Sequence, residues 1–548
     1  MAAIVLSTPF AHGQSRGNAL QTLPRVAPPA APKVSATVDH RQTQPVETVL
    51  SKTITPTSIR IEGVKSIPFA AVSAHFKSFV GKPTTVETMI AAANDVTKMY
   101  QDAGYALSFA FIPSQDFANG VVRVVAVEGY VSSISINGNA GNAESKIRAM
   151  ANHLLGQRPL RRDSFERYTA LLGQLPGLKV QANIAPPAQT DGATELKLTV
   201  ERKKIGASTG ISFNQPGIQG LFNVSENGLL SLGEQLSVSA LEPRGRDRQT
   251  YYAANYTQPI GSDGFTIKLD ASRFRSAPRD TLGLPSTVQR TIQQDKVGIT
   301  ASYPIILTNT RSLSVDSAFY GVTNQDQYTN KDTGANLGLR SQARVLQASV
   351  NWVSVSDKIV RRASLVIGKG FDALGASKEG YSNVPGAQVN NPIDLSFVRI
   401  GGSASQTNQL PFGLASVVST TGQYSAQTLP SSEQITFGAQ RFALGYEPGE
   451  AAGDKGWAGS LELNRGFNFT AKYLKSLVPY VSYALATTYL NNNPQAPARL
   501  QSLALGLRVS DSKYYSLDLS VAKPVGDAPV ESRSRSPRIN ATFSYQLD

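Results

Sequence analysis

The chain has 548 residues, a formal net charge of +14 from 53 Lys and Arg against 39 Asp and Glu, and no cysteine. This length predicts about two to four domains unless one of them is a large barrel, and the lack of cysteine excludes disulfides and thiolate metal sites. The basic residues are spread out, as at Arg244 and Arg533, with no dense basic run among aromatics, which argues against a nucleic-acid partner. No stretch approaches about 18 consecutive apolar residues, so any membrane span must be built from strands.

Residues 1–13 contain a short apolar run that ends in small residues, but they lack the basic start of a secretory signal. We interpret them as the remnant of a signal peptide, with an ordinary unstructured terminus as the alternative. Residues 14–55 are polar and rich in proline, which predicts an extended linker with room for a short helix at 46–52.

Residues 56–129 show the order strand, helix, helix, strand, strand. Pro68 opens the first helix, Thr84 and Glu87 form a capping box for the second, and Gly104 ends it. The same order recurs over residues 130–203, and a tandem repeat of about seventy residues predicts two similar small α+β domains. Helical spacing predicts one apolar face on the second helix, made of Val86, Met89, Ile90, Ala93, Val96 and Tyr100.

Residues 204–548 lose helical periodicity and alternate between apolar and polar residues, as antiparallel strands do. A soluble sandwich would have to expose polar members such as Lys268, Asp270 and Asp518 on its outside, whereas a membrane barrel places them in its lumen. We therefore predict a transmembrane antiparallel β-barrel of about 16 strands, about eleven before one long loop and about five after it. In the clearest strand, Leu503, Leu505, Leu507 and Val509 alternate with Ser502, Ala504, Gly506 and Arg508.

The long loop, within residues 431–463, is neither strand-like nor low in complexity. Loops of this length are usually functional or disordered. Phe442, Leu444, Tyr446 and Trp457 favour a packed loop over a mobile surface loop. Strand parity places it at the outer end of the barrel.

One apparent catalytic motif does not meet its structural requirements. Residues 206–210, GASTG, match the G-x-S-x-G elbow of serine hydrolases, but that elbow needs a following helix and a downstream histidine. All four histidines lie upstream and offer no zinc spacing: His12, His40, His75 and His153. We therefore predict no catalytic residue, cofactor or metal.

The wording GQYS…LPSSEQ…RFALGY…GDKGW, from 422 to 457, resembles the sixth extracellular loop of two-partner secretion transporters of the ShlB/FhaC/HecB type. These are outer-membrane barrels that export one large partner protein. The two repeats also resemble paired POTRA domains, the periplasmic modules of this class. The residues that carry that second resemblance are Tyr100, Gly104, Tyr105, Glu128, Gly129, Pro176 and Gly177.

The resemblance implies a monomer in the outer membrane of a Gram-negative bacterium, surrounded by outer-membrane lipid, with an unfolded secreted protein as its partner. It also implies POTRA domains at 56–129 and 130–203 and a loop at 428–456 folded into the barrel. Exposed POTRA strand edges would bind the partner by β-augmentation, although these domains could instead be spacers. The rival functions are a porin with periplasmic domains and an insertase that assembles outer-membrane proteins.

The chain departs from the family pattern at the loop tip. The family pairs an arginine of its Val-Arg-Gly-Tyr/Phe tip with an aspartate of an F-x-D-x-G segment, and Leu444 and Ala484 stand at those two positions here. Replacing both members of a buried ion pair by apolar groups can be nearly neutral, so the resemblance implies an apolar contact between Leu444 and Ala484. The aligned segments consist of Ala443, Leu444, Gly445 and Tyr446 in the loop and Ser482, Ala484 and Ala486 in the barrel wall.

Overall fold

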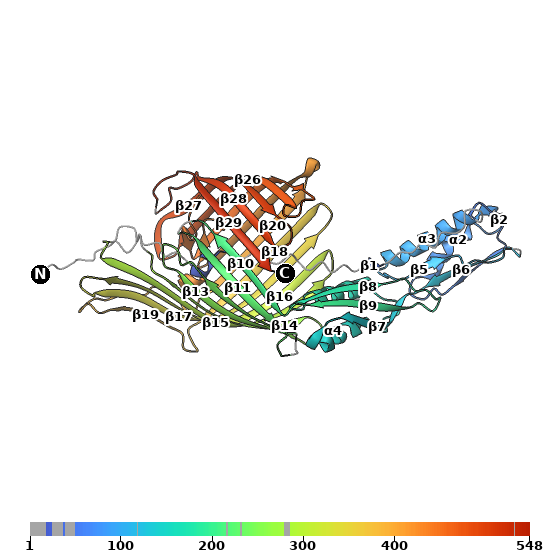
Figure 1. Ribbon diagram of the computed structural model, residues 1–548, viewed down its shortest axis with the longest axis horizontal. Coiled ribbons are helices and arrows are strands. Elements are labelled where there is room, and N and C mark those ends of the chain that lie inside the picture. Colours follow the sequence, from blue (N-terminus) through green and yellow to red (C-terminus); the bar gives the residue numbers. More distant parts are fainter. Residues whose placement is uncertain are drawn as a thin grey trace.

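The computed structural model describes residues 18–24, 37–38, 50–117, 119–214, 217–230, 233–278, 285–530 and 532–547. The predicted signal remnant at 1–13, most of the linker, His12 and His40 lie outside these residues, as do residues 46–49 of the short predicted helix. Figure 1 shows a barrel at one end of the molecule and two small units following each other away from it. Within the described residues, no helix combines the length and apolar character needed to cross a membrane.

The first small unit is a three-stranded sheet covered by two helices. The buried face of the second helix includes Met89, Val96 and Tyr100, as its spacing predicts. Its cap differs by one residue from the prediction, because Thr85 rather than Thr84 accepts a hydrogen bond, from the Thr88 amide. The elements are β2 (Thr53–Ile54), β3 (Ser58–Glu62), α2 (Phe69–Lys77), β4 (Thr84–Thr85), α3 (Val86–Asp102), β5 (Phe109–Phe111) and β6 (Val121–Val127), with the sheet order β3-β6-β5.

The second small unit repeats this order of elements and has its own apolar core. A two-residue strand from the N-terminal linker, β1 (Thr37–Val38), pairs in parallel with the end of β8 and forms one edge of the sheet. The elements are β7 (Tyr130–Gly138), α4 (Glu144–Ala151), α5 (Arg162–Gly173), β8 (Leu178–Ile184) and β9 (Ala193–Arg202), with the sheet order β1-β8-β9-β7.

The barrel is closed by pairing of its first strand with its last. Two of its strands are interrupted: β19 continues β18 along β17, and β25 continues β24 along β26. The ring therefore has 16 strands, as predicted, with eleven before the long loop and five after it. The segments are β10 (Ile205–Ser212), β11 (Gln219–Asn227), β12 (Gln235–Leu241), β13 (Thr250–Ile260), β14 (Phe265–Ser276), β15 (Val288–Leu307), β16 (Arg311–Asn330), β17 (Asn336–Val355), β18 (Ile359–Phe371), β19 (Ser377–Ser382), β20 (Val398–Gln409), β21 (Leu414–Ser425), β24 (Lys455–Arg465), β25 (Phe467–Asn468), β26 (Ser476–Leu490), β27 (Asn493–Ser510), β28 (Tyr515–Pro524) and β29 (Arg538–Leu547).

The two faces of the barrel follow the predicted alternation. On β27, Leu503 and Leu505 point outward with 48% and 64% of their surface exposed, while Ser502 and Ala504 are buried on the lumen side. Three strands, β15, β16 and β17, have 20 residues each, or about 66 Å at 3.3 Å per residue, which exceeds the 9–11 residues that a membrane needs. They extend beyond the barrel on the side away from the small units (Figure 1).

Candidate functional site

The loop between β21 and β24 folds into the barrel and packs there. It contains η5 (Ser431–Glu433) and a two-stranded sheet of β22 (Ile435–Phe437) and β23 (Ala451–Gly453). Phe437 and Tyr446 are fully buried in a cluster with Ala486 and Leu500 of the barrel wall. The expected packed loop is therefore present, and Ala486 of the predicted wall segment lies against it.

The neck of the loop is organised by one buried carboxylate. Asp454 has no exposed surface, and its oxygens accept hydrogen bonds from the amides of Leu429 and Asn491, both at 2.8 Å. The Gln434 side chain donates a third, at 3.3 Å. Because Asn491 follows β26, Asp454 connects both ends of the loop to the neighbouring strand. Asp454 belongs to the GDKGW segment, but the sequence analysis assigned it no role.

The root of the loop is held by a buried ion pair across the lumen. Glu433 Oε2 lies 2.8 Å from Arg399 Nε of β20 and accepts a hydrogen bond of 2.8 Å from Tyr320 of β16. Arg399 also donates to Gln347 of β17 at 2.7 Å. The side chains of Glu433 and Arg399 are 2% and 13% exposed, so both charges are removed from bulk water. This pair was missed from the sequence, because nothing in the order of residues pairs position 399 with position 433.

The tip of the loop, which contains the aligned residues, is fastened to the last strands of the barrel. The Gly445 amide donates to Ser502 Oγ at 2.8 Å, and the Leu444 carbonyl accepts from Asn540 at 3.1 Å. Tyr446 donates from its hydroxyl to the Asp527 carbonyl at 2.8 Å. Ala443 is buried, with a φ of 94°, a conformation that side chains rarely adopt without such contacts.

The predicted wall residues lie near this tip. Ser482 and Ala484 of β26 line the same cavity as Leu444, and Ala484 is paired in register with Ser502, which holds Gly445. The contact between the Leu444 and Ala484 side chains stays a prediction.

A second carboxylate holds the far side of the tip. Glu447 is 7% exposed and lies 3.5 Å from Arg538 of β29 and 3.9 Å from Arg246, between β12 and β13. The loop therefore supplies acids, Glu433 and Glu447, to arginines of the wall.

A cavity of about 1120 Å³ remains between the loop and the wall, and polar residues such as Ser482 and apolar residues such as Phe442 line it. Arg508 lies on its surface and contacts Glu462 at 2.7 Å and Asp518 at 3.1 Å, and Tyr480 donates to Asp518 at 2.8 Å. Arg508, Glu462, Asp518 and Tyr480 thus form one polar network on the wall of this cavity.

The N-terminal segment also reaches the folded loop. The Asn18 amide donates to Thr436 Oγ1 at 3.2 Å, and its side chain donates to the Ser432 carbonyl at 2.5 Å. The short 3-10 helix η1 (Ala19–Thr22) follows. Because β1 lies on the second small unit, the linker connects the interior of the barrel with that unit.

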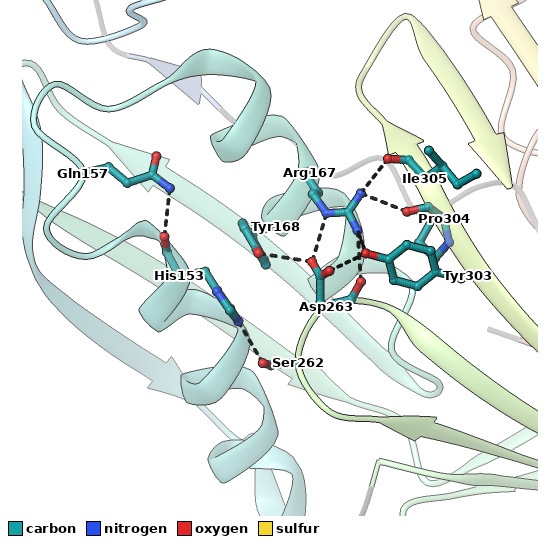
Figure 2. Close-up of polar contacts among 9 residues, drawn as sticks. All are labelled: His153, Gln157, Arg167, Tyr168, Ser262, Asp263, Tyr303, Pro304 and Ile305. Carbon is teal, nitrogen blue, oxygen red and sulfur yellow. Dashed lines mark hydrogen bonds and ion pairs between the residues drawn. The ribbon is translucent and has the colours of Figure 1, made fainter.

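The second small unit is fixed to the barrel by α5 (Figure 2). The Arg167 guanidinium lies 3.1 Å from Asp263 Oδ1 in the turn before β14, and it donates to the Pro304 carbonyl at 2.9 Å. Tyr168 donates to the same Asp263 oxygen at 3.1 Å. Burial alone would raise the pKa of Asp263, but hydrogen bonds from Tyr303 and Arg167 outweigh it and hold that pKa below its usual range.

A second group of contacts extends this joint. His153 Nε2 lies 2.8 Å from Ser262 Oγ, and its ring stacks on Tyr168 with centroids 4.5 Å apart (Figure 2). Lys146 donates to the Gly261 carbonyl at 2.7 Å. His153 is therefore an interface residue, one of the roles that its isolated position allowed.

Several residues of the POTRA resemblance meet where the two small units join. Glu128 accepts hydrogen bonds from the Ser66 amide at 2.6 Å and from the Tyr100 hydroxyl at 3.0 Å. Burial alone would raise the pKa of Glu128, but these bonds and one from the Lys65 amide lower it below the usual value. Tyr105 lies edge-on to Tyr100, with ring centroids 6.3 Å apart.

The glycines of that set allow close backbone approach. A side chain at Gly129 would meet Leu107 at 2.6 Å, and the Gly129 carbonyl accepts from the Leu160 amide of the second unit at 2.8 Å. Gly104, with a φ of 87°, accepts from the Arg162 amide at 2.8 Å. Gly177, with a φ of 65°, follows the half-buried Pro176 and accepts from the Lys203 amide at 2.7 Å, where the second unit leads into the barrel.

The apparent serine-hydrolase motif of the sequence lies within a regular barrel strand. Residues 206–210 form the middle of β10, where Ser208 pairs with Asn223 and Gln546, so no turn into a helix exists there. Among the described residues, no group of three or more His, Cys, Asp or Glu side chains is arranged to hold a metal ion.

Comparisons with known proteins identify families and relatives that match this chain. The family model "POTRA domain, ShlB-type" matches residues 54–129, and the model "Haemolysin secretion/activation protein ShlB/FhaC/HecB" matches residues 214–509, more than half of the chain. The heme/hemopexin transporter protein HuxB of Haemophilus influenzae is 20% identical over 462 residues, which cover 82% of this chain and 79% of HuxB. The outer membrane transporter CdiB of Dickeya dadantii is 23% identical over 467 residues, with 82% and 78% coverage.

Solved structures share the fold. CdiB from Escherichia coli has a TM-score of 0.67 at 16% identity and covers 94% of both chains. BamA from Haemophilus ducreyi, lacking POTRA domains 1–3, has a TM-score of 0.53 at 14% identity and covers 90% of this chain and 100% of its own. Three findings lead to one conclusion: a closed 16-strand barrel with an N-terminal POTRA domain, a family match over most of the barrel, and transporter relatives that match 82% of the chain. The chain belongs to the ShlB/FhaC/HecB haemolysin secretion/activation family and is an outer-membrane transporter that exports a partner protein by two-partner secretion.

Proposed function

We propose that the transporter binds its partner in an unfolded state at the strand edges of two POTRA domains, at 56–129 and 130–203. The observation that carries this proposal is the pairing of β1 with β8. Thr37 and Val38 pair in parallel with Asn183 and Ile184, so this sheet edge accepts an extended segment through its main chain. Main-chain pairing of this kind tolerates many sequences, as an exporter of an unfolded chain requires.

The partner then passes through the barrel of residues 204–548 as an extended chain. The polar networks of the lumen support this step, because they offer hydrogen bonds to a moving main chain. The loop at 428–456 occupies the path and must move aside. Its contacts at Glu433, Glu447 and Gly445 are the ones that have to break.

The transporter works as a monomer, without catalytic residues, cofactor or nucleic acid. A closed barrel leaves no unpaired strand edge that a second copy would have to cover. Outer-membrane lipid surrounds its outward face, where side chains such as Leu505 are exposed and apolar. Binding and conformational change account for the whole task, so no bond-breaking step is required.

Deleting residues 58–129 tests the docking step. The barrel closes through its own strands, so the deletion should still give a heat-modifiable, folded barrel. Secretion of the partner should fall to background, because the first docking domain is gone. A control with Arg148→Ala, an exposed change on helix α4 of the second small unit, should secrete normally. Normal secretion by the deletion would identify the first domain as a spacer.

A further inference from the structure

The outward face of β14 to β18 carries an apolar band with sharp edges. On β16 the outward residues between Arg311 and Thr323 include Leu313, Val315 and Phe319, and Phe319 is 37% exposed. From 313 to 321 a strand rises about 27 Å, or about 21 Å along the barrel axis at a tilt of about 40°. This agrees with the apolar band of about 25 Å found on membrane barrels.

The outer edge of this band is basic. Strand register places Arg273 on β14 beside Asp295 on β15, and Arg344 on β17 beside Gly321 on β16. On β18, Lys369 lies beside the exposed Leu346. Arg275 projects on the same face, one outward position above Arg273. We call Arg273, Arg275, Arg344 and Lys369 the outer basic belt.

The charges of this belt are largely uncompensated. Arg273 contacts Asp295 at 2.8 Å, but Arg344 donates to the Leu374 carbonyl at 3.1 Å and Lys369 to the Ser396 carbonyl at 3.4 Å, which are neutral acceptors. Arg275 is exposed and has no hydrogen bond or ion pair to any described residue. The lumen differs, because its buried arginines, such as Arg399, contact carboxylates.

We propose that the outer basic belt binds the phosphate groups of lipopolysaccharide, the phosphorylated glycolipid of the outer leaflet. The belt lies where the apolar band ends, and lipid phosphates occupy that level of the membrane. Its side chains point away from the lumen, so lipid is their neighbour. Arginine forms paired, charge-assisted hydrogen bonds with phosphate. The inference rests on the proposed lipid contact of the outward face and names the lipid.

Lipid binding to the purified full-length protein tests this. Bisphosphorylated lipid A is titrated against the protein in mild detergent, and bound copies are counted by native mass spectrometry. The variant R275Q/R344Q should bind roughly tenfold more weakly than the unchanged protein. The matched control is R311Q/R361Q, which removes two outward arginines at the opposite edge of the band and should change affinity by less than about twofold.

Further measurements distinguish the possible causes of weaker lipid A binding. Because Arg344 also holds the Leu374 carbonyl, R275Q alone, which breaks no contact, should still weaken binding roughly threefold. Lipid A without phosphates should bind the unchanged protein as weakly as the belt variant binds bisphosphorylated lipid A, and inorganic phosphate should not bind. Equal losses in belt and control variants, or tight binding of phosphate-free lipid A, would overturn the proposal. Partner secretion, assayed separately, reports on the proposed export function and should be retained in R275Q.

Discussion

The two faces of the barrel handle charge in opposite ways, although they alternate residue by residue along the same strands. On the lumen face, Arg508 lies between Glu462 and Asp518, and Arg399 contacts Glu433. On the outward face, strand β16 carries only small or apolar side chains between Arg311 and Thr323. The folded loop covers part of the first face, and the proposed function places lipid against the second. The lumen arginines Arg399 and Arg508 therefore have acid partners, whereas on the outward face of β16 the charge of Arg311 lies at the edge of the apolar band.

The largest effect should come from breaking the buried pair at the root of the loop. Glu433→Gln leaves Arg399 buried without an acid, and removal of one partner from such a pair costs about 3–5 kcal/mol. We expect the loop to leave the lumen, which would raise conductance in planar bilayers and speed hydrogen exchange at residues 435–453. The matched change Glu242→Gln affects an exposed pair with Arg244 and should alter neither measurement. Unchanged exchange in Glu433→Gln would show that the pair does not hold the loop.

A charge introduced on the lipid-facing side should lower the free energy of unfolding by less than loss of the buried pair does. It should still lower that free energy by more than a charge introduced in the lumen. Leu505→Arg places a charge in lipid, and such changes cost about 2–4 kcal/mol near mid-membrane. Gly506 is a poor lumen control, because a side chain there would meet the Tyr480 ring at 2.3 Å. Ser482→Arg is better, since Ser482 lines the cavity and pairs with Glu462 in register. The measurement is the folded fraction of each variant in urea. Equal loss of folded protein in Leu505→Arg and Ser482→Arg would refute the assignment of Leu505 to the lipid face and Ser482 to the lumen.

The alternation of residues predicted both faces and the strand count because period two is a local property of a strand. The contacts that hold the loop depend on which strands face each other across the ring, and a single sequence does not contain that information. Arg399 and Glu433 are therefore close in space without any sequence signal. The resemblance pointed to the tip residues and to the wall segment because it carried position-by-position knowledge of the loop, and the contact that it implies between Leu444 and Ala484 stays a prediction. The N-cap was misplaced by one residue because Thr84 and Thr85 are both threonine, and either satisfies the capping pattern.

A smaller effect should come from the predicted contact between the tip and β26. Leu444 is half-buried and lines the cavity with Ala484, so Leu444→Arg places a charge near the wall without a partner. Adding Ala484→Asp should restore part of the loss, with a coupling energy of about 0.5–3 kcal/mol. The measurement is a double-mutant cycle on barrel stability and on partner secretion. Additive effects in both assays would exclude the contact and leave the tip held by Ser502 and Asn540 alone.

The smallest effect should be the pH dependence of the joint between α5 and the barrel, because Asp263 is 44% exposed and solvent screens its pairing with Arg167. The pKa of Asp263 is held below its ordinary value of 3.8, so its contribution is complete above that value and is lost as the pH falls through the lowered pKa. That contribution is under about 1 kcal/mol.

Because the chain has no cysteine, spin labels can be attached at Lys179→Cys and Lys358→Cys, one on each side of the joint. The distribution of distances between the two labels should be narrow at pH 7 and should broaden near pH 3. In Asp263→Asn the same distribution should already be broad at pH 7 and should not change further at lower pH. A distribution in the unchanged joint that stays narrow near pH 3 would mean that His153, Lys146 and the carbonyl contacts of Arg167 hold the second domain without this carboxylate.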